Sequence, residues 1–341
     1  MESRHLAVLG RMLMVGLASS VSGITNTDET PNGSLENKVS PKSIRGNYHA
    51  HTTMSDGIYT PEEVVEKAIE AGLAEIGITD HYFTLKGGIN FVDDDQIDNY
   101  LRKIEDLRQK YGDRIRILAG LEIDTSCFNL KRSRLPFDKL NKLDYVLFEY
   151  VEDQGMGEAS KQQLVHSYIQ QTRAQVTQAI MKQYDLDEEA SSQEAVKYMQ
   201  QTEEVQNQIQ VLANRRGVYS LQDLVEVRKK LTCAVGLAHP DIKRNFAHFD
   251  ADELARTLKE NDIFLDACAA ARNATPERYD TYGEDWEFTP YFCGMEAFKF
   301  AFSKHGVAFA PSTDTHAENN IGDIGKAEAK MNQYHFVKKS F

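Results

Sequence analysis

Short apolar runs that are typical of β-strands alternate with amphipathic helical stretches along most of the chain. Seven runs are predicted as strands, and they cover residues 44–48, 75–78, 115–118, 145–148, 234–237, 263–267 and 307–310. The first intervening helix has clear limits, because Thr60 can cap it, Pro61 suits its first turn and Glu63 completes a capping box. Such alternation predicts parallel strands with helices outside them. The expected fold class is therefore α/β, as a distorted (β/α)7 barrel.

The net charge of the chain limits the partners that it can have. Lys and Arg number 39 against 52 Asp and Glu, which gives a formal charge of −13 over 341 residues. Such a chain repels a phosphate backbone, so no stable complex with nucleic acid is expected. A small anionic substrate is still compatible, because bound metal ions can reverse the local sign of the charge.

The first 43 residues differ in composition from the rest of the chain. In residues 1–23, Arg4 and Arg11 come before a short apolar run and small residues follow, which is the layout of a secretory signal peptide. The alternative is a frayed N-terminal helix. We expect a secreted or periplasmic protein if residues 1–23 are a signal peptide, and a cytoplasmic one otherwise. Residues 25–43 are polar and turn-rich, which predicts a linker, and residues 44–341 are expected to form a single barrel domain. No run reaches the ~20 apolar residues of a membrane span.

Histidine and carboxylate side chains gather at the ends of the predicted strands. They are His49, His51 and Asp56 after the first strand, Asp80 and His81 after the second, Glu122 after the third, Glu149 after the fourth, His239 after the fifth, Asp266 within the sixth, and Asp314 and His316 after the seventh. In a β/α barrel the carboxyl ends of the strands converge on one face, so we expect these side chains to meet there.

Imidazoles and carboxylates are ligands of Zn²⁺, Mn²⁺ and Fe²⁺ alike. The His49-x-His51 pair alone is weak evidence, because such pairs are more often surface or packing features. Five histidines directly after predicted strands, together with the carboxylates, exceed what one ion requires. Two or three divalent metal ions close together can bind a phosphoryl group, lower the pKa of a bound water and stabilise the leaving oxygen. The set therefore predicts metal-assisted hydrolysis of a phosphate ester.

The segment NYHAHTTMSDGIYTPEEVVEKAIEAGLAEIGITDH, followed in order by GLEID, GLAHPD and STDTH, resembles the PHP family of polymerase and histidinol phosphatase domains. The resemblance covers residues 46 to about 325. It implies a distorted seven-stranded barrel, up to three bound metals and phosphoesterase activity. It also implies the ligands: His49, His51, Glu122 and Asp314 for a first metal, Glu122 as a bridge to a second metal at His239, and Asp56, His81 and His316 for a third.

One departure from the family pattern concerns the fourth strand. The family usually has a histidine shortly after it, whereas DYVLFEYVED has none and Glu149 is the nearest candidate ligand. Strand alternation places Tyr145, Leu147 and Glu149 on one side of the strand. The alternative is that Glu149 points into the helices and leaves the second ion weakly held.

The second departure is an insertion at residues 152–216, which is rich in Gln, Glu, Ala and Lys and predicts one or two long helices. Its apolar face is expected to lie against the barrel or against a partner subunit of a homo-oligomer. That face consists of Val165, Tyr168, Ile169, Val176 and Ile180. The alternative is a solvated hairpin over the rim of the barrel.

The resulting hypothesis is a metal-dependent phosphohydrolase that acts on a small phosphorylated metabolite, with a metal-bound hydroxide attacking phosphorus at a di- or trinuclear centre. Glu122, Asp314 and His316 are the expected catalytic residues. Arg272, Lys243 and Arg244 are expected to bind the substrate anion. Aromatic residues of the loop before the last helix either stack on a base or cover the core, and they are Tyr279, Tyr282, Trp286 and Phe288. The alternatives are a nuclease or nucleotide phosphodiesterase, and a non-catalytic metal-binding domain.

Overall fold

The computed structural model describes residues 45–82, 84, 92–126, 135–214, 217–269, 282–283, 287–316 and 320–341. The candidate signal peptide and most of the linker lie outside these residues. The chain divides into two compact units, of which one comprises Ser43–Gln163 and Arg216–Phe341 and the other includes Leu164–Arg215. Among the described residues, no helix is long and apolar enough to cross a membrane.

A single sheet of parallel strands forms the centre of the larger unit. Its main path is β1 (Gly46–Asn47), β2 (Glu75–Ile78), β4 (Arg116–Asp124), β5 (Tyr145–Glu149), β6 (Ala234–Leu237), β7 (Ile263–Cys268), β8 (Ala308–Ser312) and β9 (Val337–Lys338), and the short β3 (His81–Tyr82) pairs with β4. β1 and β8 also meet, because the amide of Tyr48, which follows β1, donates to the Pro311 carbonyl of β8 at 3.1 Å. The expected distorted (β/α)7 barrel is confirmed, with β3 and β9 as additional short strands.

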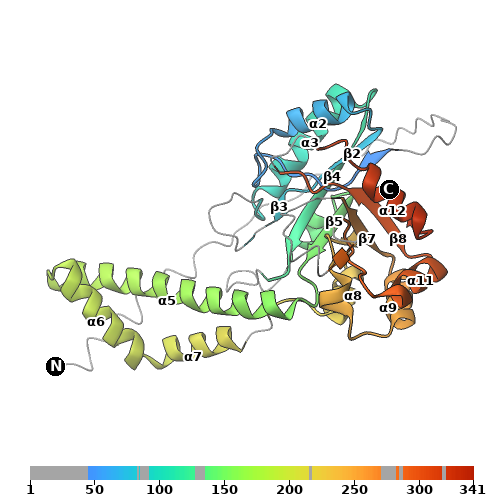
Figure 1. Cartoon of the computed structure of the whole chain (residues 1–341). Coiled ribbons are helices and arrows are strands. Elements are labelled where there is room, and N and C mark those ends of the chain that lie inside the picture. The colour runs from blue at the N-terminus through green and yellow to red at the C-terminus, as the bar shows by residue number, and fades with distance from the viewer. Residues whose placement is uncertain are drawn as a thin grey trace. The chain divides into compact units, whose positions relative to one another are not determined.

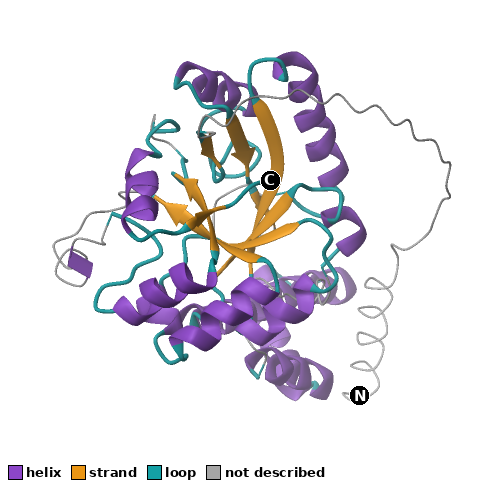
Figure 2. Cartoon of the chain, turned by 90° about the vertical axis from the view of Figure 1, so that its right-hand side faces the viewer, coloured by secondary structure: helices purple, strands orange, loops and turns teal. Residues whose placement is uncertain are grey.

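Helices cover the outside of these strands (Figure 2). They are α2 (Pro61–Glu70), α3 (Ile97–Tyr111), α4 (Phe137–Leu140), α8 (Leu221–Arg228), the π-helical turn η1 (Ile242–Phe246), α9 (Ala251–Glu260), α11 (Glu296–His305) and α12 (Gly325–Gln333). The predicted capping box of α2 is present, since Glu63 N donates to Thr60 Oγ1 at 3.2 Å and Thr60 N donates to Glu63 Oε2 at 2.7 Å. Local sequence therefore determines where this first helix begins.

Strand alternation decides which side chains point into the barrel. In β5, Val146 and Phe148 pack in the core shared with the helices, whereas Tyr145 and Leu147 pack in the separate interior cluster. Glu149 therefore ends β5 on the interior side, as predicted. The third predicted strand is longer than expected, because pairing with β3 and β5 extends β4 to Asp124. Glu122 consequently lies within a strand and not after it.

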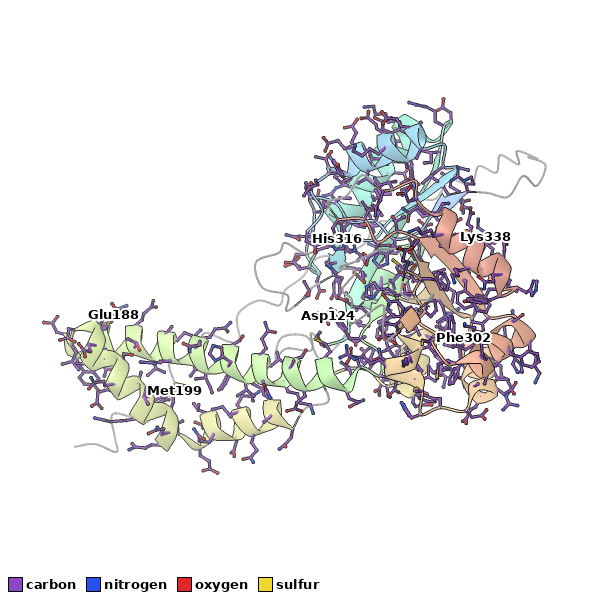
Figure 3. The ribbon with its side chains drawn as sticks, viewed as in Figure 1. Asp124, Glu188, Met199, Phe302, His316 and Lys338 are labelled. Carbon is purple, nitrogen blue, oxygen red and sulfur yellow. The ribbon has the colours of Figure 1, made fainter. Side chains whose placement is uncertain are left out.

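The helical unit contains most of α5 (Gln154–Tyr184), together with α6 (Glu188–Gln201) and α7 (Glu203–Ala213), which are labelled in Figure 1. The insertion contains three helices among its described residues, whereas one or two long helices were predicted. Part of the apolar face of α5 packs within this unit, because Val176 and Ile180 form a core with residues of α6 and α7. Those residues are Ala195, Tyr198, Met199 (labelled in Figure 3) and Val205.

Candidate metal centre

The loop after β1 brings three of the expected residues to the carboxyl end of the barrel. His49 and His51 lie on one side of an extended segment, and their Nε2 atoms are 3.1 Å apart. Asp56 follows in a turn that Asp80 anchors, because Asp80 Oδ1 accepts hydrogen bonds from the Thr52 amide at 2.7 Å and from Ser55 Oγ at 2.6 Å. Asp80 therefore shapes the loop that carries His51 and Asp56.

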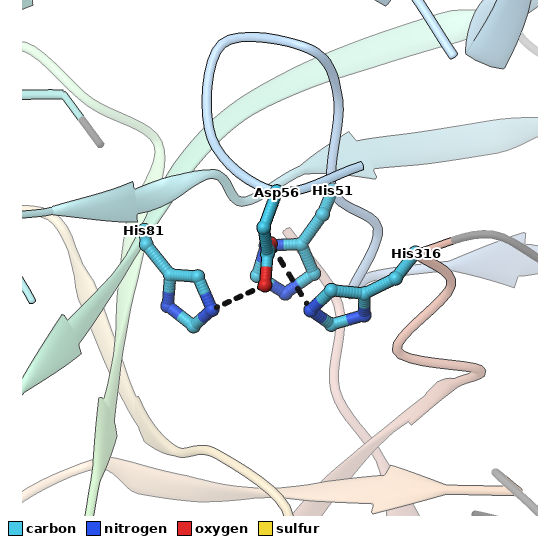
Figure 4. A group of neighbouring side chains, drawn as sticks. All are labelled: His51, Asp56, His81 and His316. Carbon is cyan, nitrogen blue, oxygen red and sulfur yellow. Dashed lines mark ion pairs between the residues drawn. The ribbon is translucent and has the colours of Figure 1, made fainter. Parts of the chain in front are cut away.

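Four side chains from three places in the chain meet around Asp56 (Figure 4). The carboxylate of Asp56 lies between His81, whose Nε2 is 3.6 Å from Oδ2, and His316, whose Nε2 is 3.2 Å from Oδ1. The ring of His51 stacks on that of His316 with centroids 4.0 Å apart. The ligand atoms of these four residues all lie within 4.8 Å of one another, so the group could hold a metal ion.

Glu122 lies at the centre of the remaining groups, and its two oxygens face different histidines. Oε2 is 3.0 Å from His81 Nδ1 and 3.5 Å from His49 Nε2, whereas Oε1 is 2.9 Å from His239 Nε2. This carboxylate is fully buried. A carboxylate whose oxygens point in two directions has the geometry required of a bridge between two ions.

Asp314 approaches the same histidines from β8. Its Oδ1 lies 3.2 Å from His51 Nε2 and 3.4 Å from His49 Nε2, and its Oδ2 lies 3.7 Å from His239 Nε2. Both Asp314 and His239 have positive φ values, of 50° and 26°. Non-glycine residues seldom adopt this region, and such backbone strain concentrates at functional sites.

Glu149 faces this centre and not the helices. It is fully buried, and its oxygens lie 3.8 Å from His81 Nδ1 and 3.9 Å from His239 Nε2. His81, Glu122 and Glu149 form a further group whose ligand atoms could hold an ion. The geometry therefore favours the expected inward orientation of Glu149 over the alternative.

The electrostatics are those of buried charges that stabilise one another. Burial opposes charge on His49, but Asp314, Glu122 and Asp266 raise its pKa well above the ordinary value. Burial likewise opposes charge on Glu122, yet His49 and His81 hold its pKa well below the usual range. The pKa of His51 is lowered, first by burial and then by His81. Glu122 thus stays ionised in a nearly dry setting, which is the state that a metal ligand requires.

Asp266 lies within β7 and was expected from the sequence to lie near the other side chains, but not to be a metal ligand. Its side chain is buried, and Oδ2 accepts a hydrogen bond from His49 Nδ1 at 2.8 Å. A carboxylate inside the apolar run IFLDAC is the signal that could have identified it.

A cavity of about 340 Å³ opens beside His239 and Asp314. Of the three expected cationic residues, Arg244 lines it, and its Nη2 lies 3.0 Å from Asp153 Oδ1. Lys243 lies over the ring of Tyr282, with Nζ 5.5 Å from the centroid.

Two of the aromatic residues that the sequence analysis places in the loop before the last helix have different surroundings. Tyr282 stacks on Tyr291 of the cavity wall at 4.4 Å, whereas Phe288 is buried in the core. Phe288 therefore covers the core. Arg272, Tyr279 and Trp286 lie outside the described residues.

The donor set fits divalent metal ions. Four overlapping groups of histidine nitrogens and carboxylate oxygens occur among the described residues, and most of their members are buried. Within the same residues, no donor meets buried Glu122 Oε2 in hydrogen-bonding geometry, although histidine nitrogens surround it. An ionised oxygen in this position is costly to bury unless a cation compensates it.

The family model described as PHP domain matches residues 47–266. The chain belongs to the PHP domain family. This match confirms the family that the sequence resembles. A curated relative, the DNA polymerase/3'-5' exonuclease PolX of Bacillus subtilis, is 32% identical over 96 residues, which are 28% of this chain and 16% of that protein. The chain thus spans a small part of the length of this relative.

Solved structures with some similarity include a histidinol phosphate phosphatase from Lactococcus lactis, in complex with zinc, L-histidinol and phosphate. It is 16% identical, with a TM-score of 0.45 and coverage of 86% of this chain and 95% of that one. An amidohydrolase from Chromobacterium violaceum with bound sulfate is 17% identical, with a TM-score of 0.38 and coverage of 81% and 89%.

Proposed function

We propose that this PHP protein hydrolyses a phosphate monoester of a small metabolite at a centre of two or three divalent metal ions. The observation that carries the proposal is the convergence of imidazoles and carboxylates from β1, β3, β4, β5, β6 and β8 or the loops after them, with ligand atoms in overlapping groups. Such a density of buried ligands exceeds what packing or one ion requires.

Each ion has a proposed set of ligands. The first is held by His49, His51, Glu122 and Asp314, the second by Glu122, Glu149 and His239, and the third by Asp56, His81 and His316. The set contains no thiolate, which is compatible with zinc, manganese or iron. Bound ions would lower the pKa of a water molecule and neutralise the non-bridging phosphate oxygens.

The residues of the chain orient these groups. Glu122 and Asp314 are proposed as catalytic residues because the two carboxylate oxygens of each residue face different histidines. His316 is proposed as the third, since it lies at the partly exposed rim of the centre. Its Nδ1 lies 3.0 Å from the Asp314 carbonyl, and donation there would leave the Nε2 lone pair for the ion that Asp56 is also proposed to bind.

The cavity supports the proposal of a small anionic substrate. Its volume of about 340 Å³ suits a small metabolite, and it leads from His239 and Asp314 to Arg244. We propose that Arg244 contacts the substrate anion, with Lys243 beside it on η1 and Arg272 after β7. A guanidinium binds phosphate oxygens in a fixed fork, which suits this role.

Substitution of Arg244 tests this assignment. Arg244→Gln is expected to raise KM by about tenfold, or ~1.4 kcal/mol, and to change kcat by less than about threefold. Arg256→Gln is the matched control, because Arg256 is exposed on α9. Metal content and melting temperature should accompany the kinetics, since the loss of Arg244 leaves Asp153 without this ion pair. An unchanged KM would exclude Arg244 from substrate binding.

A nuclease or nucleotide phosphodiesterase is the second candidate, and the match to part of PolX is what favours it. The net charge of −13 counts against a long nucleic acid. A non-catalytic metal-binding domain is less compatible with the ligand positions, all of which are filled by metal-binding residue types.

One panel of substrates separates these candidates. Phosphate or p-nitrophenol release is measured with p-nitrophenyl phosphate, bis-p-nitrophenyl phosphate and a short single-stranded oligonucleotide, together with the metal content of the protein. We expect metal-dependent hydrolysis of the monoester at the highest kcat/KM. Preference for the diester or the oligonucleotide would replace our proposal by the second candidate, and bound metal without hydrolysis would favour the non-catalytic domain.

A further inference from the structure

One buried carboxylate contacts two proposed ligands that come from different strands. Asp266 points into the barrel from β7, and its Oδ2 accepts hydrogen bonds both from His49 Nδ1 at 2.8 Å and from the backbone amide of His239 at 3.1 Å. Its Oδ1 accepts from Ser312 Oγ on β8. Asp266 itself belongs to none of the candidate ligand groups among the described residues.

We propose that Asp266 is a positioning residue that presents His49 and His239 together to neighbouring metal ions. The proposal rests on the proposed function only in that these two histidines bind metal. His49 is a proposed ligand of the first ion and His239 of the second. Asp266 acts on both histidines through the same oxygen, Oδ2.

For His49, the contact fixes which ring nitrogen is available. With the Nδ1 hydrogen donated to Asp266, Nε2 carries the lone pair. Nε2 is the atom that faces the centre, at 3.5 Å from Glu122 Oε2 and 3.4 Å from Asp314 Oδ1. The negative charge of Asp266 also makes the imidazole a stronger donor to a cation.

For His239, the contact fixes the backbone. This residue has φ = 26°, a strained conformation for a non-glycine residue. The hydrogen bond from its amide to Asp266 compensates for part of that strain. In this conformation the ring reaches Glu122 Oε1 at 2.9 Å. Asp266 thus acts on the orientation of one ligand ring and on the main chain of the other.

Two substitutions separate the charge from the hydrogen bonds. In Asp266→Asn the amide oxygen can still accept from His49 and His239 while the amide nitrogen donates to Ser312 Oγ, so only the charge is lost. Asp266→Ala removes both. Losses of 10–100-fold in metal affinity are typical when such a partner of a ligand is changed. We expect about tenfold weaker binding of Co²⁺ in Asp266→Asn and about a hundredfold in Asp266→Ala.

The measurement is competition for Co²⁺ between the full-length protein and a chelator, together with the visible absorption spectrum of the bound Co²⁺. Both tight Co²⁺ equivalents should weaken, and the spectrum of Asp266→Ala should change, since the ligand geometry changes. Asp144→Asn is the control. Asp144 also accepts a backbone hydrogen bond, from Ala119 at 2.6 Å, but it precedes β5 at the opposite end of the strand.

Three outcomes would contradict the inference. Wild-type affinity and spectrum in Asp266→Ala would show that Asp266 does not position either ligand. Weakening of only one ion would contradict the shared role, and equal weakening in Asp144→Asn would reduce the effect to general destabilisation. If Asp266→Ala does not fold, as judged by circular dichroism, Asp266→Asn alone decides, and wild-type affinity and spectrum in that variant contradict the inference. Failure of the wild-type protein itself to bind Co²⁺ would instead contradict the proposed function.

Discussion

Replacing either His49 or Asp314 by alanine is expected to remove bound metal and to lower kcat by a factor of about 10³ or more, which is ~4 kcal/mol of transition-state stabilisation. Both side chains are buried at the centre, where their ligand atoms are 3.4 Å apart. The loss of either one removes a donor that no neighbour replaces without movement of the strand that carries it. Metal analysis of the purified variants and phosphate release from p-nitrophenyl phosphate measure the two effects.

The fold should survive these substitutions, because the residues lie after β1 and β8 and not in the packed core between strands and helices. Circular dichroism checks this point. His248→Ala is the matched control, since His248 is exposed and its ring packs against Phe249. Normal metal content with wild-type turnover in His49→Ala or Asp314→Ala would show that the residue is not a ligand.

Glu149→Gln is expected to produce the second-largest effect, a loss of about 10–100-fold in affinity for one ion together with a corresponding fall in kcat at limiting metal. The variant keeps the shape of the side chain and removes its charge. The carboxylate faces His239, so the loss should fall on the second ion, which Glu149 is proposed to hold together with Glu122 and His239. Chelator competition and turnover as a function of metal concentration give the two quantities.

The charge of Glu149 also has a consequence for metal preference. A carboxylate where the family usually has a neutral imidazole makes the site harder, which favours Mn²⁺ or Fe²⁺ relative to Zn²⁺. Glu149→His should therefore shift the preference toward Zn²⁺. Glu152→Gln serves as the control, because its carboxylate accepts a hydrogen bond from the Leu221 amide instead of facing the histidines. If Glu149→Gln binds metals and turns over like the wild type, Glu149 is not a ligand.

The parts of the centre that follow from local rules could be predicted from the sequence. Period-two alternation in β5 is sufficient to place Glu149 on the interior side with Tyr145 and Leu147. The capping box at Thr60 likewise fixes the start of α2. In both cases the determining contacts lie within a few residues of one another along the chain.

The features that could not be predicted depend on residues far apart in the sequence. The extension of β4 that places Glu122 within a strand requires pairing with β3 and β5. The ion pair of Arg244 joins it to Asp153, 91 residues away, and the contact of Asp266 with His49 spans 217 residues. The apolar face of α5 indicated a partner surface, but its periodicity does not distinguish the barrel from α6 and α7.

The most direct test is a metal titration of the full-length protein after removal of metals with a chelator. Phosphate release from p-nitrophenyl phosphate is followed as Zn²⁺, Mn²⁺ or Fe²⁺ is added in known equivalents. We expect negligible release without metal and a rise that is complete at two or three equivalents. Full turnover in the metal-free protein, or stoichiometric metal binding with no hydrolysis of any phosphate ester in the panel, would contradict the assignment of this centre as the hydrolytic site.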